Sequence, residues 1–207
     1  MDTILVLAPH PDDGEFGLGA TLHRFAQEGK NVFYAAFSPC IASVPDGFPK
    51  DILYKELGDA TGKLRIPKEN LITFDCAVRN FPAIRQDILE SLVKLNRQLK
   101  PDLVFMPNSK DLHQDHQVIH NEGLRAFKKT RILGYELPWN DVAFDNRFYI
   151  KVTEENLTAK TEAIACYKSQ GFRPYTSKSF FRSLAQMRGM QAGEDLAEAF
   201  EPIRWKY

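Results

Sequence analysis

The sequence has little of what marks a membrane-bound, disulfide-stabilised or nucleic-acid-binding protein. Its 207 residues include only three cysteines, Cys40, Cys76 and Cys166, which are far apart and form no CxxC pair, so we expect no disulfide framework. No apolar run approaches the ~20 residues that a membrane helix needs, which argues against membrane insertion. Lys and Arg together number 27, and so do Asp and Glu. This zero net charge provides no basic surface for nucleic acid.

The N-terminus also lacks the features of a signal peptide. Asp2 stands where basic residues would be expected, and a strand-like apolar run begins at Thr3. With 43% hydrophobic and 26% charged residues, the chain has the composition of an ordinary soluble protein. We therefore expect a cytoplasmic protein that folds as a single domain over residues 1–207.

The sequence does contain a regular alternation of short apolar runs with longer segments of helical periodicity. Four runs rich in branched or aromatic residues are predicted to be strands: Ile4–Ala8, Val32–Phe37, Leu71–Phe74 and Leu103–Met106. Helices are predicted between them, over Gly19–Glu28, Ile52–Leu64 and Ala83–Leu99. This order predicts an α/β fold in which a Rossmann-like, mainly parallel sheet is sandwiched by helices.

The second half of the chain continues this alternation less regularly. Strands are predicted over Ile132–Leu137 and Phe148–Val152. Helices are predicted over Glu154–Gln170 and Phe180–Met190, with a loop at Pro174–Lys178 between them. We expect this part to form a small C-terminal sub-lobe beside the site rather than a separate domain.

A first cluster of polar side chains directly follows the first predicted strand. His10, Asp12, Asp13 and Glu15 lie within six positions. Like charges this close raise one another's pKa unless a cation or a proton offsets them. Ligands of mainly parallel sheets bind at the carboxyl ends of the strands, so the position suits a site. Imidazole together with carboxylate indicates a divalent metal, Zn²⁺ or alternatively Fe²⁺ or Mn²⁺.

A second cluster follows the fourth predicted strand. It spans Asp111–His116 with the sequence DLHQDH, so three of the five histidines of the chain fall in the two clusters. Both clusters follow strands of one parallel sheet and are expected to face the same crevice. Two histidines and one carboxylate, with one position left for water, are the ligands of a catalytic zinc site. The spacing alone leaves open which of His113 and His116 is a ligand.

Together the two clusters, HPDD-x-E and D-x-H-x-D-H, resemble the LmbE-like (PIG-L) family of metal-dependent N-acetylglucosamine deacetylases. The similarity continues at Phe16–Thr21, Glu56–Gly58 and Ala197–Phe200. At the matching positions the resemblance implies three metal ligands: His10, Asp13 and His116. Some members carry Glu directly after the two aspartates, whereas Gly14 intervenes here, and this leaves the role of Glu15 open.

The resemblance also implies the catalytic groups. Asp12 is expected to act as general base on the metal-bound water. The metal and His113 are expected to stabilise the oxyanion of the tetrahedral intermediate, and Asp115 to hold His113 in the right tautomer and charge state. A metal lowers the pKa of its water towards ~7, so a base as weak as Asp12 suffices.

Three further side chains are candidates for substrate binding, and two of them have a structural alternative. Arg79, after the third predicted strand, could grip a sugar hydroxyl or a carboxylate, or be an ordinary loop cation. Arg188 and Trp139 could line the substrate pocket, with the Trp139 ring stacked on a sugar. A Trp beside Pro138 is, however, more often plain packing.

Two histidines outside the clusters are interpreted as structural. His120 lies four residues after His116, on the same face of a helix. We interpret it as a partly buried helix residue, because zinc needs no fourth protein ligand. His23 is expected at the surface of the first helix.

These observations predict a zinc-dependent hydrolase that removes an N-acetyl group from a 2-acetamido sugar or its conjugate. The expected partner is a small amino-sugar substrate, and a homo-oligomer is compatible with the sequence. Two alternatives stay open. A two-His-one-carboxylate Fe(II) enzyme would use the same ligands, although the strand–helix alternation does not suggest its usual β scaffold. A non-catalytic sugar-binding module would be expected to have lost Asp12 or His113, and both are present.

Overall fold

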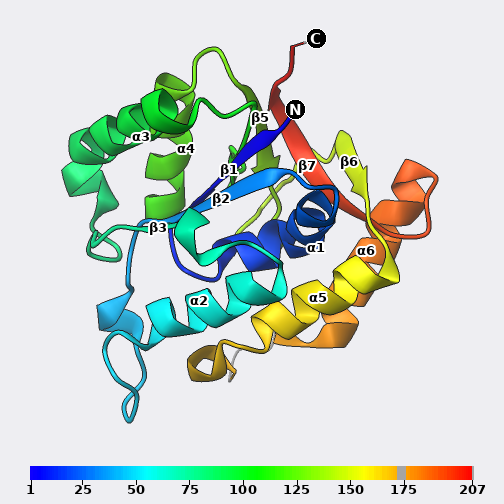
Figure 1. Cartoon of the computed structure of the whole chain (residues 1–207), viewed down its shortest axis with the longest axis horizontal. Coiled ribbons are helices and arrows are strands. Elements are labelled where there is room, and N and C mark those ends of the chain that lie inside the picture. The colour runs from blue at the N-terminus through cyan, green and yellow to red at the C-terminus, as the bar shows by residue number, and fades with distance from the viewer. Residues whose placement is uncertain (172–175, 207) are drawn as a thin grey trace.

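A seven-stranded sheet runs through the centre of the protein, in the strand order β3-β2-β1-β4-β5-β7-β6 (Figure 1). The computed structural model describes residues 1–171 and 176–206. The strands are β1 (Thr3–Ala8), β2 (Asn31–Ala36), β3 (Leu71–Thr73), β4 (Leu103–Pro107), β5 (Arg131–Tyr135), β6 (Phe148–Lys151) and β7 (Ala197–Arg204). The first five are parallel to one another, and β7 pairs antiparallel with both β5 and β6. The predicted α/β fold with a mainly parallel sheet is confirmed.

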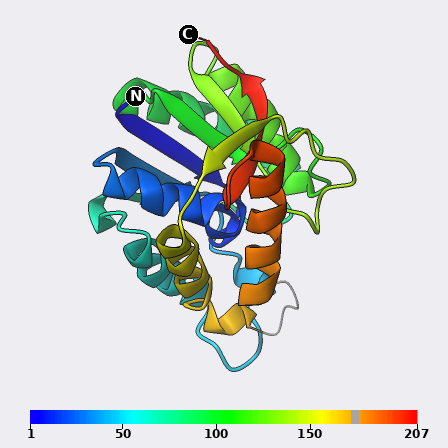
Figure 2. The same cartoon turned by 90° about the vertical axis from the view of Figure 1, so that its right-hand side faces the viewer.

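Helices cover both faces of the sheet, as Figures 1 and 2 show. One face carries α3 (Arg85–Leu99) and α4 (Gln114–Ala126). The other carries α1 (Asp13–Gln27), α2 (Ile52–Lys63), α5 (Glu154–Ile164) and α6 (Lys178–Ala192). Short 3-10 helices also lie between these elements, among them η1 (Ile41–Ser43), η2 (Lys68–Asn70), η3 (Phe81–Ile84) and η4 (Lys168–Gln170).

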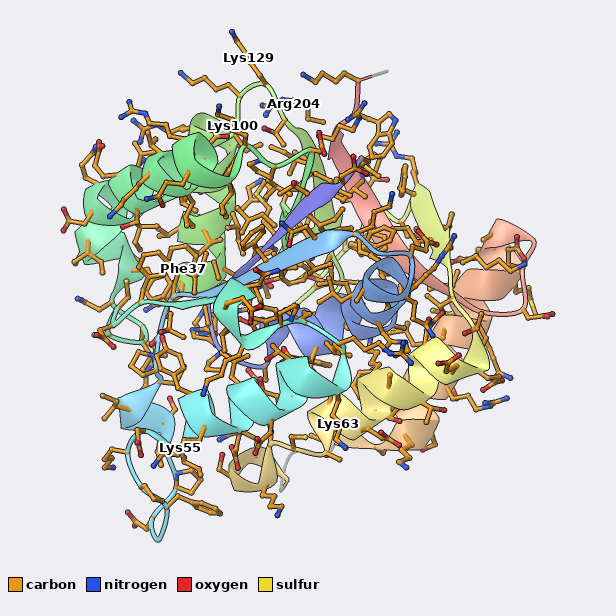
Figure 3. The ribbon with its side chains drawn as sticks, viewed as in Figure 1. Phe37, Lys55, Lys63, Lys100, Lys129 and Arg204 are labelled. Carbon is orange, nitrogen blue, oxygen red and sulfur yellow. The ribbon has the colours of Figure 1, made fainter. Side chains whose placement is uncertain are left out.

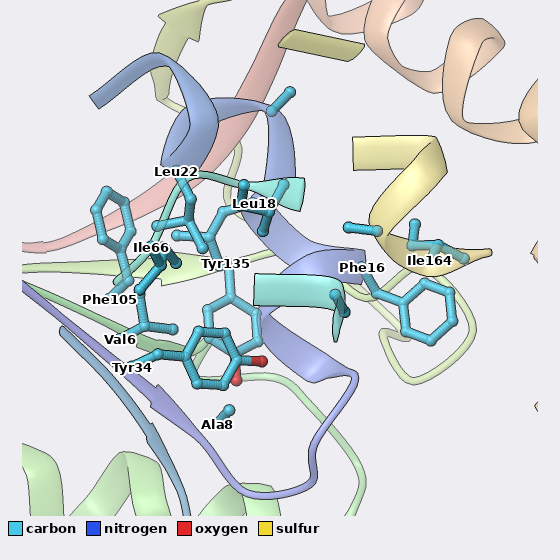
Figure 4. Packing of buried hydrophobic residues seen from close by; sticks show 14 of the residues in the cluster. Val6, Ala8, Phe16, Leu18, Leu22, Tyr34, Ile66, Phe105, Tyr135 and Ile164 are labelled. Carbon is cyan, nitrogen blue, oxygen red and sulfur yellow. The ribbon is translucent and has the colours of Figure 1, made fainter. Parts of the chain in front are cut away.

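The hydrophobic core has two halves, one on each face of the sheet, and β1 contributes to both. Ile4 and Val6 pack into the half under α1, while Leu5 and Leu7 pack into the half under α3 and α4. Successive side chains of a strand point to opposite faces, so a strand covered on both sides has to be apolar throughout. Figure 4 shows the half under α1, with Tyr34 among the side chains that fill it.

Helix α1 begins six residues earlier than predicted and lies very close to the sheet. A Cβ on Gly14 would come within 2.5 Å of the Tyr34 ring, and one on Gly17 within 2.6 Å of the Tyr135 ring. Glycine lowers helix propensity, and this hides the first turn of the helix from sequence patterns. Here it permits the close approach of helix and strand.

The C-terminal part, expected to form a small sub-lobe, supplies the last two strands of the sheet. β7 was not predicted as a strand, and it inserts between β5 and β6 (Figure 2). Helix α5 ends at Ile164, earlier than the predicted Gln170, and the chain then forms η4. Of the predicted loop at Pro174–Lys178, the first two residues lie outside the described residues, and Lys178 begins α6.

Basic side chains at the surface are not gathered on one element. In Figure 3, Lys55 and Lys63 project from α2, whereas Lys100 and Lys129 project from the opposite end of the view. Within the described residues, no helix is both long and apolar enough to cross a membrane.

Candidate active site

The two predicted polar clusters meet at the carboxyl ends of neighbouring strands. β1 and β4 pair in parallel, so the loop of His10–Asp13 and the turn of His113–His116 lie side by side. Both line a cavity of about 230 Å³. The rest of the lining comes from other loops and helices and includes Cys40, Leu53, Val78, Trp139, Asn140 and Gln170.

Three potential metal-ligating atoms converge at one side of this cavity. His10 Nδ1 lies 3.1 Å from His116 Nε2, and Asp13 Oδ2 lies 3.3 Å from the former and 3.2 Å from the latter. Ligand atoms about 2.0–2.1 Å from a tetrahedral zinc lie about 3.3–3.4 Å from one another. The three predicted ligands therefore form a triangle of the size that a tetrahedral divalent cation requires.

Carboxylates behind the two histidines determine which ring nitrogen faces the triangle. His10 Nε2 lies 3.1 Å from the Asp115 carboxylate, and His116 Nδ1 lies 2.6 Å from the Asp111 carboxylate. Each outer nitrogen donates its proton to its carboxylate, so the inner nitrogen presents a lone pair. Two such lone pairs 3.1 Å apart repel unless a cation or a proton lies between them. Carboxylate-supported histidines are the usual environment of a metal ligand, and these residues fit a divalent metal.

The electrostatics of the triangle favour positive charge. Burial lowers the pKa of His116, but the Asp13 charge and the hydrogen bonds to Asp111 and Asp13 outweigh it and raise the pKa to about 10. The pKa of His10 shifts in the same direction, since the Asp13 charge and the Asp115 hydrogen bond outweigh burial. Burial raises the pKa of Asp13, but the His116 and His10 charges hold it well below its ordinary value. The field that stabilises protons here equally stabilises a bound cation.

His113 lies next to the triangle and is only half-buried. Its Nδ1 accepts a hydrogen bond from the backbone N–H of Asp115, so the neutral ring carries its proton on Nε2. Burial and the charges of His116 and His10 lower the pKa of His113, and this favours the neutral form. The side chain can therefore donate a hydrogen bond from Nε2.

The carboxylate of Asp115 has a different partner from the one expected. It accepts from His10 Nε2 and from the backbone N–H groups of Arg79 and Phe81, and only the backbone of Asp115 contacts His113. The expected effect on the His113 tautomer thus comes from a main-chain donor. The buried Asp115 side chain instead supports the predicted ligand His10, because it accepts the hydrogen bond of the His10 Nε2.

His113 also belongs to a second possible ligand set. Potential ligand atoms of His10, His113 and His116 all lie within 4.8 Å of one another. We favour Asp13 over His113 as the third ligand, because its oxygen lies 3.2–3.3 Å from both inner nitrogens. The carboxylate also offsets the charge of a cation, which a neutral imidazole does not.

Asp12 lies beside this triangle in the cavity lining and is buried. It occupies the N-cap position of α1, yet its side chain makes no capping hydrogen bond. A carboxylate at an N-cap usually accepts from the first-turn amides. The Asp12 side chain thus contributes to the cavity rather than to the helix end.

The three candidate substrate residues lie in different places. Trp139 lines the cavity and packs edge-on against Phe16. Arg79 has a φ of +64° and contributes its main chain, which donates to Asp115 and accepts from Gln114, while its side chain lies outside the described lining. Arg188, too, lies outside that lining.

Arg188 instead belongs to a neighbouring ion pair. Its guanidinium forms a two-bonded contact with the Glu136 carboxylate, and both side chains are largely buried. A paired, buried guanidinium is committed to that carboxylate, so the arrangement does not support the expected contact of Arg188 with substrate.

Glu15, whose role the sequence left open, ties the first loop to the sheet. Its carboxyl oxygens lie 2.5 Å from the Tyr34 hydroxyl and 2.9 Å from the Tyr167 hydroxyl, and each hydroxyl is also 2.8 Å from the Pro11 carbonyl. Burial raises the pKa of Glu15 to about 8, although both tyrosine hydrogen bonds act against the shift. The network holds the main chain directly before Asp12.

The two remaining histidines lie outside the site. His120 is buried in α4 and its Nδ1 contacts the Pro107 carbonyl, in keeping with the structural interpretation. The expectation of a surface His23 is wrong. His23 is buried, and its Nδ1 lies 3.0 Å from the amide nitrogen of Asn156 on α5, which packs over α1.

Sequence patterns missed some residues of the site. Asp111 was part of the second motif without an assigned role, and its contact with His116 follows only from the turn that α4 makes. Asn140 and Gln170 line the cavity from segments that had no motif. Their proximity to the site depends on contacts between distant parts of the chain.

Comparisons with known proteins agree with this geometry. The sequence family described as PIG-L, GlcNAc-PI de-N-acetylase, matches residues 5–127. A protein of Escherichia coli (strain K12), named uncharacterized deacetylase YaiS, is 28% identical over 179 residues, which cover 80% of this chain and 90% of the relative.

Two solved structures illustrate the likeness in fold. The N,N'-diacetylchitobiose deacetylase of Pyrococcus horikoshii has a TM-score of 0.77 at 20% identity, covering 97% of this chain and 83% of its own. GalB, the 4-carboxy-2-hydroxymuconate hydratase of Pseudomonas putida KT2440, has a TM-score of 0.79 at 17% identity, covering 100% and 98%. Because the second enzyme is named for a different reaction, the fold alone does not select the chemistry.

Proposed function

The chain belongs to the PIG-L (GlcNAc-PI de-N-acetylase) family, and from this and the geometry of its site we propose that it is a metal-dependent N-deacetylase of 2-acetamido sugars or their conjugates. The observation that carries the proposal is the triangle of His10 Nδ1, Asp13 Oδ2 and His116 Nε2 beside a cavity. An amide bond is stable in water, so its hydrolysis needs an activated water, a stabilised oxyanion and a proton for the leaving amine.

The triangle would hold the metal, with zinc as the expected ion and Fe²⁺ or Mn²⁺ as alternatives. A divalent cation bound there supplies Lewis acidity, which lowers the pKa of water and polarises the amide carbonyl. Asp111 and Asp115 keep the two imidazoles oriented through their outer nitrogens. Asp13 contributes the negative charge.

Asp12 is proposed as the general base. It lies between the proposed ligands His10 and Asp13 and lines the cavity next to Asp13, so one carboxylate would ligate while its neighbour faces the reacting water. Asp12 accepts the proton of that water as the oxygen attacks the carbonyl carbon. A positioned acid–base group of this kind typically contributes 10²–10⁴-fold to the rate.

His113 is proposed to stabilise the charge that develops on the carbonyl oxygen. Its Nδ1 is occupied by the Asp115 amide, so Nε2–H is the group that the side chain can donate. The C–N bond breaks as the amine takes up the proton that Asp12 accepted from the water, while His113 stays neutral and only donates a hydrogen bond. The products are acetate and a free amino sugar.

The cavity supports a sugar as substrate. Its lining combines the aromatic side chain of Trp139 with polar side chains that include Asn140 and Gln170. Sugars bind to such combinations, since their C–H faces pack on aromatic rings while their hydroxyls form hydrogen bonds. A family named for the removal of acetyl from a glucosamine conjugate agrees with this choice.

The proposal is tested by measuring acetate release and metal content together. The purified protein is loaded with Zn²⁺, Fe²⁺ or Mn²⁺ and incubated with N-acetylglucosamine, N,N'-diacetylchitobiose and acetylated glucosamine conjugates. We expect metal-dependent, stoichiometric release of acetate and free amine from at least one of them. The His116→Ala variant is expected to lose both metal and activity. Metal-loaded protein that releases acetate from none of these compounds would overturn the proposal.

A further inference from the structure

Gln170 is a buried polar residue in the wall of the active-site cavity, and one of its polar atoms has no partner. The side chain is 1% exposed and belongs to η4. Within residues 1–171 and 176–206, only two buried side-chain polar atoms lack a hydrogen bond: Thr21 Oγ1 and Gln170 Oε1. Of these two residues, Gln170 is the one that lines the cavity.

Neighbouring residues determine which end of the Gln170 amide is satisfied. The Ser169 hydroxyl donates to the Glu56 carboxylate at 2.6 Å, so its oxygen is left to act as an acceptor. Gln170 Nε2 donates to that oxygen at 3.3 Å. The reverse orientation would place Oε1 against an oxygen whose only proton is already used. Glu56 and Ser169 thus leave Oε1 as the unpaired end.

An unpaired buried carbonyl oxygen is unusual, because nearly all such groups in folded proteins have a donor. It is costly for folding, whereas a ligand that brings a donor removes that cost on binding. We propose that Gln170 Oε1 accepts a hydrogen bond from one ring hydroxyl of the substrate sugar, and so selects substrates that carry this hydroxyl. The inference rests on the proposed function for the identity of the ligand.

The chemistry of the atom restricts the ligand. Oε1 only accepts, so it selects for a hydroxyl and against an ether, a deoxy carbon or a ketone at the same ring position. Since Oε1 is buried, we expect the amide to turn slightly towards the ligand, a movement that breaks no hydrogen bond at this oxygen. A site built in this way rejects the analogue that lacks the donor, since the acceptor is then left unpaired.

The test uses glucosamine, the product, because it binds without turnover. Its affinity for the zinc-loaded protein and for the Gln170→Met variant is measured by calorimetry, together with the affinities of 3-deoxy-, 4-deoxy- and 6-deoxyglucosamine. Methionine keeps the length of the side chain and removes the acceptor. We expect Gln170→Met to weaken glucosamine binding roughly tenfold, the usual effect of one uncharged hydrogen bond.

The decisive result is that the effects on affinity of Gln170→Met and of removing one sugar hydroxyl are not additive for one of the three deoxy analogues. The wild type should bind one deoxy sugar about tenfold more weakly than glucosamine, and Gln170→Met should bind the two equally. If the variant does not fold, the comparison of the four sugars on the wild type still tests whether one ring hydroxyl is selected. A wild type that binds all four sugars equally would overturn the inference, as would a variant effect that is the same for all four.

Controls separate this inference from the proposed function. Gln186→Met makes the same chemical change at an exposed position of α6 and is expected to leave all affinities unchanged. Zinc content should match that of the wild type in both variants. If the glucosamine series shows the expected pattern but no acetylated sugar releases acetate, the proposed function fails and the hydroxyl-binding role of Gln170 stands. If acetate is released but the wild type binds all four sugars equally, the proposed function stands and the hydroxyl-binding role of Gln170 fails.

Discussion

His116 Nδ1 and Asp111 Oδ2 lie 2.6 Å apart, and both side chains are 1% exposed. The charge of Asp111 therefore acts on the imidazole without competition from water. It holds the proton on Nδ1 and makes Nε2 a better donor of electrons to a cation. Asp111 also accepts from the backbone N–H of His113, so one carboxylate organises the start of α4 and orients a ligand.

Asp111→Asn should therefore weaken metal binding although Asp111 is not a proposed ligand. The amide keeps an acceptor oxygen but removes the charge that supports His116, and we expect a 10–100-fold loss of zinc affinity. Competition with a chromophoric chelator measures it. Asp145→Asn, which removes a carboxylate that pairs with Arg147 outside the cavity lining, serves as the matched control. Equal affinity in wild type and Asp111→Asn would contradict the role.

Asp12 and Asp13 are adjacent and are expected to respond in opposite ways to the same substitution. Asp13→Asn should lose most of the metal, because Oδ2 of Asp13 is a corner of the ligand triangle. Asp12→Asn should keep the metal and lower kcat by 10²–10⁴-fold, because it removes the proton acceptor and leaves the ligand triangle in place. Elemental analysis and acetate release are measured on both proteins. Near-wild-type turnover of Asp12→Asn would refute its assignment as base.

His113→Gln distinguishes an oxyanion donor from a metal ligand. If His113 donates from Nε2, the variant keeps stoichiometric zinc and loses about 10²–10³ in kcat, as for the removal of one oxyanion donor. If the variant loses its zinc, the ligand set is His10, His113 and His116 instead. Metal content and kcat should be determined on the same preparation.

Sequence patterns located the site because the two motifs are local and follow strands. The clusters at His10 and His116 each come after a continuous apolar run, and parallel strands place such loops at one edge. The partners of these residues were not visible in the same way. The Asp115 carboxylate contacts His10, 105 positions away, rather than the nearby His113. Which of two histidines a carboxylate reaches depends on the direction of a helix turn, and spacing does not encode that.

The missed elements have similar causes. β7 carries the buried Glu198 and an interior Pro202. Its first four residues are buried and its last four are half-buried, so it shows neither the alternation of a strand with one exposed face nor the continuous burial of a central strand. Polar residues inside a strand are stable only with partners, here Lys160 of α5. The burial of His23 likewise depends on Asn156, 133 positions away. Such positions look exposed until tertiary structure supplies the partner.

Asp141 gives the stability of the protein a specific pH dependence. Burial raises its pKa from 3.8 to about 7, Asp111 and Glu136 act in the same direction, and hydrogen bonds from Asn108 and Leu137 oppose the shift. Between about pH 4 and 7 the unfolded chain has lost this proton while the folded protein keeps it. Folding stability contributed by Asp141 is therefore full below pH 4 and falls as pH rises to 7.

Asp141→Asn removes this titration. The free energy of unfolding of the variant relative to wild type should rise by ~2 kcal/mol from pH 4 to pH 7, after allowance for partial exposure. Urea unfolding is followed at each pH with a chelator present, so that metal release does not contribute. The histidines of the site titrate in both proteins and cancel in the difference. A difference that is flat across this range would contradict the raised pKa.

The buried pair of Lys160 and Glu198 joins α5 to β7 and to the middle of α1. The two charges lie 2.6 Å apart, and Glu198 also accepts from the backbone N–H groups of Ala20 and Thr21. These amides are available because Leu18, with a φ of −150°, interrupts the helix. Glu198 thus acts as a cap for the second half of α1, and Lys160 balances its charge.

Lys160→Met should consequently be far more destabilising than the loss of a surface ion pair. It leaves a buried carboxylate without its cation, which typically costs 3–5 kcal/mol, against ~0–1 kcal/mol for an exposed pair. Lys55→Met, which removes the exposed pair with Asp51, is the matched control. The double variant Lys160→Met/Glu198→Gln should recover much of the loss, because glutamine is neutral and still accepts from the helix amides. Urea unfolding measures all four proteins, and equal effects of Lys160→Met and Lys55→Met would show that Glu198 does not need its partner.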